Sequence, residues 1–277
     1  MKIGCKEFDI SSNQSYVMGI LNITPDSFSD GGKYINRDHA LRQAEQMIKD
    51  GVDIIDVGGE STRPGYTKIS NSEEIARITP IIEALKELCD VPISVDTYKW
   101  EVAQAALQSG ANMINDIWGL DYYEDPEHHM AKIVANANVP VCIMHNRVNG
   151  VNSSSRKEFT DILVNDLKNR LKIAEENGIS PDHIMLDPGV GFAKTFHENM
   201  WCMSSIKDIK ALGYPVLLGI SNKSLIGNIT GTPATERKEG TIALNVLGRQ
   251  YGCCFFRVHD VKGNRQALDV TDRILCE

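Results

Sequence analysis

The sequence contains no apolar run that could cross a membrane and nothing that resembles a secretion signal. No segment of the 277 residues approaches the roughly 20 uninterrupted apolar residues that a membrane helix needs. The first residues, "MKIGCKEFDISSNQ", lack the apolar stretch of a signal peptide. We therefore expect a soluble, cytoplasmic protein that makes no membrane contact.

Cysteine pairs with the C-x-x-C spacing are missing, and basic residues are fewer than acidic ones. The seven cysteines, an odd number, include no C-x-x-C pair and lie mostly within apolar runs, which favours buried thiols over zinc ligands or disulfides. The 37 acidic side chains exceed the 29 basic ones, so the formal net charge is −8. Such a chain has no general attraction to nucleic acid or to anionic membranes. An anionic ligand would need a local cluster of positive groups.

What the sequence does contain is one pattern that recurs along its length, a short apolar run that ends in a polar residue. Runs such as "YVMGIL" are typical of strands that are covered on both faces. Eight of these runs end at polar residues, which are Asn22, Asp56, Asp96, Asn115 with Asp116, His145, Asp187, Ser221, and Arg257 with His259.

Helical patterns of apolar residues lie between these runs. Examples are residues 40–48, residues 81–88 after a predicted helix start at Pro80, and residues 162–174. Eight alternating strand and helix units, with no low-complexity linker, predict a single-domain α/β protein with a (β/α)8 TIM barrel. A doubly wound open sheet is the alternative. In a barrel, the carboxyl ends of the strands meet on one face, so we expect the polar strand ends to converge there.

Six stretches of the sequence are long and specific enough to indicate a family. They read "GILNITPDSFSDGG", "DIIDVGGESTRPG", "ISVDTYKWEVAQAALQSGANMINDIWG", "LDPGVGFAKT", "GISNKSLIG" and "RVHDV". In order and spacing they resemble dihydropteroate synthase over nearly the whole chain. The resemblance implies one pterin-binding barrel over residues 1–277, a homodimer, and sensitivity to sulfonamides. It also implies an enzyme of folate biosynthesis that joins 6-hydroxymethyl-7,8-dihydropterin diphosphate to 4-aminobenzoate, with 7,8-dihydropteroate and pyrophosphate as products.

The pterin site is expected at the ends of several strands. A dihydropterin offers an amino group beside a ring N–H, which the carboxylate of Asp187 can accept in parallel, and a carbonyl oxygen that suits the cation of Lys223. The resemblance adds Asp96 and Asn115 at the other ring nitrogens and Phe192 in the pocket wall. Asp187 also begins the turn "DPG", where an aspartate is common without any ligand.

The diphosphate requires positive charge at the same mouth. Arg257 and His259 alternate on the last strand and point to the same side, so they predict an anion clamp. Asn22 offers a neutral oxygen to Mg²⁺, which keeps several waters and binds diphosphates through few protein ligands. The resemblance gives the matching asparagine this role. An asparagine that caps a turn without any metal is the alternative.

We predict that bond breaking precedes bond making. Loss of diphosphate leaves a positive charge on the methylene group that the dihydropterin ring can delocalise, and the Asp96 carboxylate stabilises this cation. The amine of 4-aminobenzoate then attacks. This route needs no covalent enzyme intermediate, which agrees with the lack of a recognisable Ser-His-Asp or reactive-cysteine arrangement.

The loops "TPDSFSDGG" and "ESTRPGY" have a composition that suits closure over the second substrate. The resemblance implies that a phenylalanine and a proline sandwich its ring, while a helix start favours its carboxylate. The residues assigned to 4-aminobenzoate are Phe28, Thr62, Arg63, Pro64 and Ser224, with Asp30 beside them. For Asp30, a surface-loop role is the alternative. The residues expected to act in catalysis are Asp30, Arg63, Asp96 and Lys223.

One departure from the family lies beside this second site. The usual Ser-Arg-Lys reads Ser221-Asn222-Lys223 here, which removes a permanent positive charge. A second change, Ala193 in "GFAKT", replaces a common glycine. Two other functions are therefore open: a pterin-binding paralogue without synthase activity, and the pterin-binding domain of a corrinoid-dependent methyltransferase. The diphosphate clamp and the first two loops argue against the methyltransferase.

Overall fold

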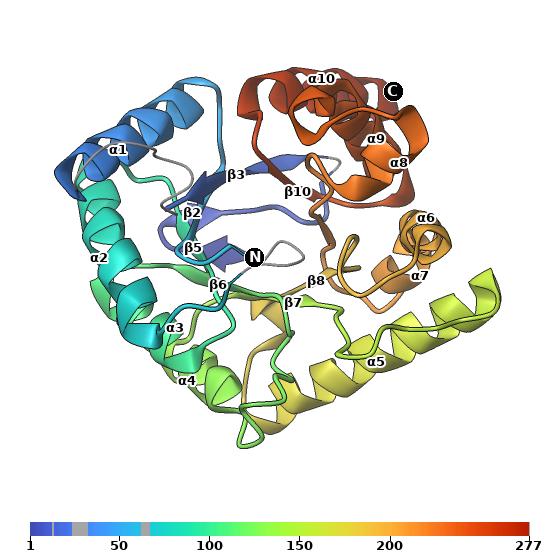
Figure 1. The fold of residues 1–277 in the computed structure, drawn as a ribbon, viewed down its shortest axis with the longest axis horizontal. Coiled ribbons are helices and arrows are strands. Elements are labelled where there is room, and N and C mark those ends of the chain that lie inside the picture. Colours follow the sequence, from blue (N-terminus) through green and yellow to red (C-terminus); the bar gives the residue numbers. More distant parts are fainter. Residues whose placement is uncertain (13, 24–32, 62–66, 277) are drawn as a thin grey trace.

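Eight parallel strands form a barrel with helices around it (Figure 1) in this computed structural model, which describes residues 1–12, 14–23, 33–61 and 67–276. The strands are β3 (Tyr16–Asn22), β4 (Ile54–Gly58), β5 (Ile93–Asp96), β6 (Met113–Asp116), β7 (Val141–Met144), β8 (Ile184–Asp187), β9 (Leu217–Leu218) and β10 (Phe255–Val258). They pair in the order β8-β7-β6-β5-β4-β3-β10-β9. A parallel bridge between Leu186 and Val216 joins the two ends of this order. The predicted (β/α)8 barrel is confirmed, and the open sheet is excluded.

Helices follow the strands along the chain and cover the outside of the barrel. They are α1 (Lys33–Lys49), α2 (Asn71–Leu88), α3 (Trp100–Ser109), α4 (His129–Ala137), α5 (Arg156–Glu176), α6 (Phe196–Ser204), α7 (Ile206–Lys210), α8 (Ser224–Thr230), α9 (Lys238–Tyr251) and α10 (Val261–Leu275). None of the helices in the described part of the chain is long and apolar enough to cross a membrane. All seven cysteines are free.

The predicted helix start at Pro80 is wrong. Helix α2 begins earlier, at Asn71, and the side chain of Ser70 accepts a hydrogen bond from the backbone N–H of Glu73 at 3.2 Å. Pro80 lies inside this helix. Ile78, which precedes the proline, is fully buried in the core, so the apolar face of the helix extends across it. This packing outweighs the helix-breaking tendency of proline.

The interior of the barrel is built in two layers. A small antiparallel hairpin, β1 (Lys2–Ile3) with β2 (Lys6–Glu7), leads to Phe8, whose ring lies 4.9 Å from that of Tyr16 in the apolar layer. In four strands, an apolar residue of this layer is followed two positions later by a polar one, and residues two apart point to the same side. The pairs are Ile54 and Asp56, Met113 and Asn115, Met185 and Asp187, and Phe255 and Arg257. The polar layer thus lies toward the carboxyl ends of the strands.

The loop between β8 and α6 contains a backbone conformation that its residue disfavours. Ala193 is exposed and has a φ angle of +46°. An L-residue with a Cβ atom is strained in this left-handed region, whereas glycine is not.

We predict that Ala193→Gly stabilises the protein. The relief of strain outweighs the extra chain entropy of glycine, so the free energy of unfolding should rise by roughly 0.5–1 kcal/mol. This corresponds to an increase of about 1–4 °C in the melting temperature, measured by calorimetry. The control is Ala105→Gly in the middle of α3, where the same substitution should destabilise. A melting temperature for Ala193→Gly at or below that of the unsubstituted chain would contradict the strain.

Candidate active site

Arg257 occupies the centre of the polar layer. Its Nε donates to Oδ2 of Asp56 and its Nη2 donates to Oδ2 of Asp96, both at 2.6 Å. Asn115 donates from Nδ2 to the same oxygen of Asp56 at 3.2 Å. Both carboxylates are buried, and each has one oxygen, Oδ1, without a hydrogen-bond partner among the described residues. The network links β4, β5, β6 and β10.

The charged groups in this network change one another's pKa values. Burial raises the pKa of Asp96 to about 7, although the cation of Arg257 opposes the increase. Burial acts to lower the pKa of Arg257, but Asp56 and Asp96 together raise it above its usual range. The guanidinium therefore stays charged, while Asp96 can exchange a proton near neutral pH.

A second pair of charges lies at the ends of β8 and β9. Oδ1 of Asp187 accepts a hydrogen bond from the backbone N–H of Gly189 at 2.6 Å. Lys223 precedes α8, donates to the carbonyl of Val190, and places its Nζ 4.7 Å from the ring centroid of Phe192. Burial raises the pKa of Asp187, and Lys223 opposes this shift. The motif pair Asp187 and Lys223 is therefore brought together with Phe192, as the sequence predicts.

The residues expected at the diphosphate lie on neighbouring strands. His259 follows β10, and its ring Nδ1 is 2.9 Å from Oγ of Ser221. Asn22 ends β3, and a Cβ atom built on neighbouring Gly58 would lie 3.6 Å from Oδ1 of Asn22 and 3.9 Å from Oδ2 of Asp96. A side chain at position 58 would therefore contact both groups, and glycine leaves this position unfilled.

Two polar strand ends do not join this mouth. Asp116 accepts hydrogen bonds from the backbone N–H groups of Trp118 and Leu120 at 2.9 and 2.7 Å, so it stabilises the turn after β6. The ring Nε2 of His145 lies 2.9 Å from Oδ2 of Asp166 on α5. Burial lowers the pKa of His145 to about 3, so its ring is neutral. The expected convergence therefore holds for some of the strand ends only.

The expected site for the second substrate is described only in part. Phe28, Asp30, Thr62, Arg63 and Pro64 lie outside the described residues. Ser224 is exposed at the first position of α8. Asn222 has a φ angle of +56°, and its backbone N–H donates to Oγ1 of Thr241 at 3.1 Å. An asparagine tolerates this left-handed conformation better than most residues.

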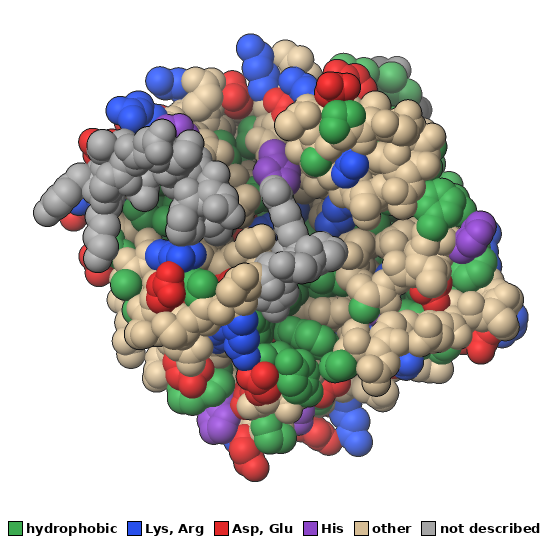
Figure 2. Space-filling view, viewed as in Figure 1, with side chains coloured by type: hydrophobic (Ala, Val, Ile, Leu, Met, Phe, Trp, Pro, Cys, Tyr) green, Lys and Arg blue, Asp and Glu red, His purple; other side chains and the backbone are tan. Residues whose placement is uncertain are grey.

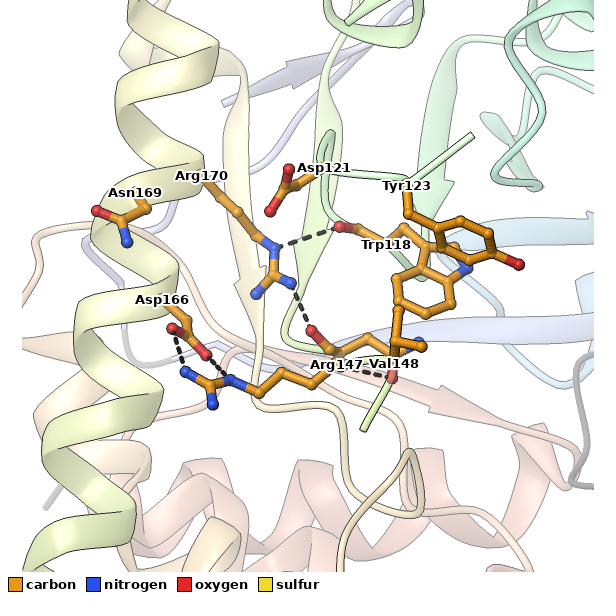
Figure 3. Close-up of a pocket in the computed structure, with 9 residues that line it drawn as sticks. Trp118, Asp121, Tyr123, Arg147, Val148, Asp166, Asn169 and Arg170 are labelled. Carbon is orange, nitrogen blue, oxygen red and sulfur yellow. Dashed lines mark hydrogen bonds and ion pairs between the residues drawn. The ribbon is translucent and has the colours of Figure 1, made fainter. Parts of the chain in front are cut away.

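A pocket of about 290 Å³ lies beside the barrel, between the segments that follow β6 and β7 and helix α5 (Figure 3). Arg170 extends from α5 and donates to the carbonyls of Trp118 at 3.2 Å and Asn146 at 2.5 Å. Arg147 binds both oxygens of Asp166, at 2.6 and 2.9 Å. Arg170 thus joins the loops that follow β6 and β7, and Arg147 joins the second of these loops to α5, while Nη1 of Arg170 has no hydrogen-bond partner among the described residues.

Sequence reasoning missed two parts of the site. Asp56 was recognised as a strand end but was given no role at the site, because β4 continues beyond it to Gly58. The alternation of Ile54, Asp56 and Gly58 would have placed its side chain inside the barrel. The second part is a buried cluster in which Lys99 binds Glu60 at 2.7 Å and Glu74 at 2.8 Å. These partners lie far apart in sequence, and no local pattern connects them.

The mouth thus combines buried carboxylates with the cations of Arg257 and Lys223. Figure 2 shows atoms of Lys, Arg and His side chains near the middle of the viewed face, in a chain whose net charge is −8. A closed barrel with such groups at the carboxyl ends of its strands has the arrangement of a (β/α)8-barrel enzyme.

Comparisons with known proteins agree with this arrangement. A model of the pterin binding enzyme family matches residues 18–259, so the chain belongs to that family. The chain is 51% identical to dihydropteroate synthase of Clostridium beijerinckii, over 99% of both chains. A crystal structure of dihydropteroate synthase from Clostridium difficile in the presence of pteroic acid has a TM-score of 0.90, with 42% identity and 100% of each chain covered.

A third relative extends the comparison to a bound second substrate. Dihydropteroate synthase of Xanthomonas albilineans with 4-aminobenzoic acid has a TM-score of 0.88 and 37% identity, covering 95% of this chain and 94% of its own. These matches place the chain among the dihydropteroate synthases, which are enzymes of folate biosynthesis. The family predicted from the six motifs is confirmed.

We predict a loss of activity with the pterin substrate in mildly alkaline solution. Burial lowers the pKa of Lys223 to about 8, against the opposing effect of Asp187. The ammonium is therefore lost as the pH rises through 8, and with it the cation that the sequence predicts for the pterin carbonyl. The value of kcat/KM for the dihydropterin diphosphate should decline above this pH, because its pH dependence reports the pKa values of groups in the free enzyme.

Two variants complete this test. Lys223→Met should have a low kcat/KM without this alkaline decline, whereas Lys168→Met, at an exposed position of α5, should keep it. A flat profile for the unsubstituted enzyme between about pH 7.5 and 9.5 would show that Lys223 does not titrate there.

Proposed function

We propose that this chain condenses 6-hydroxymethyl-7,8-dihydropterin diphosphate with 4-aminobenzoate, by loss of diphosphate followed by attack of the amine. The observation that carries the proposal is the joint placement of Asp187, Lys223 and the Arg257 network at one mouth of the barrel. Motif similarity alone would be compatible with a paralogue. The geometry adds charged and hydrogen-bonding groups that suit both the pterin ring and the diphosphate of the first substrate.

The pterin ring binds between the two groups of charges. Asp187 has its Oδ1 on Gly189, so its other oxygen, Oδ2, faces the space beside Gly219, where an added Cβ atom would lie 3.3 Å away. This glycine leaves room for the amino group and ring N–H of the pterin. Lys223 donates to the ring carbonyl, and Asn115 and Asp96 bind the remaining ring nitrogens. Phe192 covers the ring.

The diphosphate binds at Arg257 and His259, with Asn22 nearby. Arg257 keeps its charge because two carboxylates stabilise it, so it can attract the anion at any pH at which the enzyme works. The described residues contain no cluster of three acidic, histidine or cysteine ligands. Mg²⁺ therefore suits the donor set only as an ion that takes most of its oxygen ligands from diphosphate and water. The amide oxygen of Asn22 would hold it, and the ion would neutralise the leaving group.

The carboxylates act when diphosphate departs. The positive charge that develops on the methylene and spreads into the ring lies near Asp96, whose ionised form stabilises it in a site with little water. Burial raises the pKa of Asp96 to about 7, so this carboxyl group gains or loses its proton near neutral pH. The neighbouring cation of Arg257 favours the ionised form of Asp96, which this step requires.

The amine of 4-aminobenzoate then attacks the methylene carbon and loses a proton. Thr62, Arg63, Pro64, Phe28 and Asp30 are proposed to enclose this substrate, and Arg63 and Asp30 to act in the reaction. Ser224 is proposed to bind its carboxylate. Sulfonamides are expected to compete at the same place. A homodimer and a cytoplasmic location stay predictions from the sequence.

The direct test is pyrophosphate release from the dihydropterin diphosphate, with and without 4-aminobenzoate. We expect rapid release that depends on 4-aminobenzoate, together with formation of dihydropteroate. Asp187→Asn should raise the KM for the pterin substrate at least about five-fold, because an unpaired buried group costs roughly 1–3 kcal/mol. The control is Asp182→Asn in the exposed turn before β8, which should behave like the unsubstituted enzyme. Binding of the pterin without any turnover would identify a paralogue instead.

We also predict that Asn222→Arg lowers the KM for 4-aminobenzoate several-fold, since a partly exposed charge-assisted contact contributes about 1 kcal/mol. The KM for the pterin substrate should change little. The left-handed backbone at this position should make the variant slightly less stable, by roughly 1 kcal/mol. Asn222→Met supplies length without charge and should not lower the KM. Equal KM values for all three proteins would show that position 222 does not face the substrate.

A further inference from the structure

Lys194, in the loop between β8 and α6, binds three backbone carbonyls with one ammonium group. Its Nζ lies 3.2 Å from the oxygen of His145, 2.9 Å from that of Gly189 and 3.1 Å from that of Phe192. An ammonium has three N–H donors, so all of them are used. The acceptors belong to two different loops, which follow β7 and β8. Lys194 therefore joins these loops at the edge of the pterin site.

The two loops meet closely at this point. Gly189 has a φ angle of +69°, and a Cβ atom there would lie 1.9 Å from the oxygen of His145 and 3.1 Å from Nζ of Lys194. The same glycine donates its N–H to Asp187. A second tie comes from Asn199, whose Oδ1 accepts from the N–H of Gly191 at 2.6 Å and whose Nδ2 donates to the carbonyl of Lys194 at 3.0 Å. Movement of Lys194 would therefore displace the turn that orients the Asp187 carboxylate.

The ammonium of Lys194 and the carboxylate of Asp187 influence each other's pKa. Among the described residues Lys194 forms no ion pair, and it is only partly exposed, so its ammonium loses some hydration with carbonyl groups as its hydrogen-bond partners. Burial lowers its pKa, while Asp187 and Glu198 act in the opposite direction. Conversely, Lys194 is one of the cations that lower the pKa of Asp187 against the effect of burial. The charge thus favours the ionised state of the pterin-binding carboxylate.

The charged and titratable groups around Asp187 come from several elements. The cations are Lys223 before α8, Lys194 before α6 and Arg257 on β10. The thiols of Cys142, Cys202 and Cys253 also interact with Asp187, and burial raises the pKa of each thiol, so they stay neutral. Lys194 itself also faces Arg170 and Glu198. Of the three cations, Lys223 and Arg257 are assigned to the substrate, which leaves Lys194 as the one with only protein partners.

We propose that Lys194 is a positioning residue for the pterin ring, which orients Asp187 and Phe192 through its three carbonyl contacts and places a positive charge near the Asp187 carboxylate. Lys194 does not touch the substrate. The inference rests on the proposed role of Asp187 in binding the pterin. It assigns to the lysine of "GFAKT" a function that its place in the loop alone does not reveal.

The test measures binding of 6-hydroxymethylpterin, which carries no phosphate that would titrate, by calorimetry between about pH 5 and 8. Lys194→Met should bind about ten-fold more weakly at neutral pH, because the carboxylate is less well oriented. As the pH falls, its affinity should decline at a higher pH than that of the unsubstituted enzyme, since the pKa of Asp187 rises without the cation. The KM for 4-aminobenzoate should not change. Lys168→Met is the control for the loss of a lysine.

A second variant separates charge from geometry and keeps the test decisive if Lys194→Met folds poorly. Lys194→Arg keeps the charge but cannot place three donors at one point, so it should weaken binding without moving the pH midpoint. Unchanged affinity in Lys194→Met would overturn the proposal, and so would weaker binding with an unchanged midpoint. Asp187→Asn is measured beside them. If that variant binds the pterin normally, the proposed function of Asp187 is at fault rather than the role of Lys194.

Discussion

The ion pairs of Arg257 with Asp56 and Asp96 are the interaction on which the site depends. All three side chains are largely or fully buried, and the two carboxylates have no other cation within salt-bridge distance among the described residues. Removing one member of such a group leaves an uncompensated buried charge, which typically costs about 3–5 kcal/mol. The pairs also fix the geometry, because they connect β10 to β4 and to β5 across the interior. Asn115 extends the connection to β6.

The layered interior explains why a charged network can exist inside the barrel. The layer toward the amino ends of the strands is filled by apolar side chains such as Met18, Met185 and Phe255, which close that end against water. Polar side chains lie one layer nearer the carboxyl ends and face a mouth where a ligand can enter. Two further lysines, Lys223 and Lys194, approach Asp187 from outside the strands. An acidic protein thereby gathers several cations at one end of its barrel.

Much of this arrangement follows from the sequence, and the exceptions have physical causes. Runs such as "HIMLD" end where the strand ends, so Asp187 was placed correctly from the pattern alone. Asp56 was not given its role because β4 extends past it, and only the two-residue alternation reveals its direction. Pro80 misled the helix assignment because burial of neighbouring apolar residues outweighed a local preference. The contact of Lys194 with His145 could not be predicted, and neither could the ion pairs of Lys99, since only the fold brings these partners together.

The measurement that tests the central claim most directly is a double-mutant cycle on the free energy of unfolding, determined with urea for Arg257→Met, Asp56→Asn and the double variant. Arg257→Met should lose about 3–5 kcal/mol alone, since it leaves two buried carboxylates without their cation. In the Asp56→Asn background the same substitution should cost at least about 1 kcal/mol less, because one of these carboxylates is gone. Additive effects, or a loss below about 1 kcal/mol for Arg257→Met, would contradict the account.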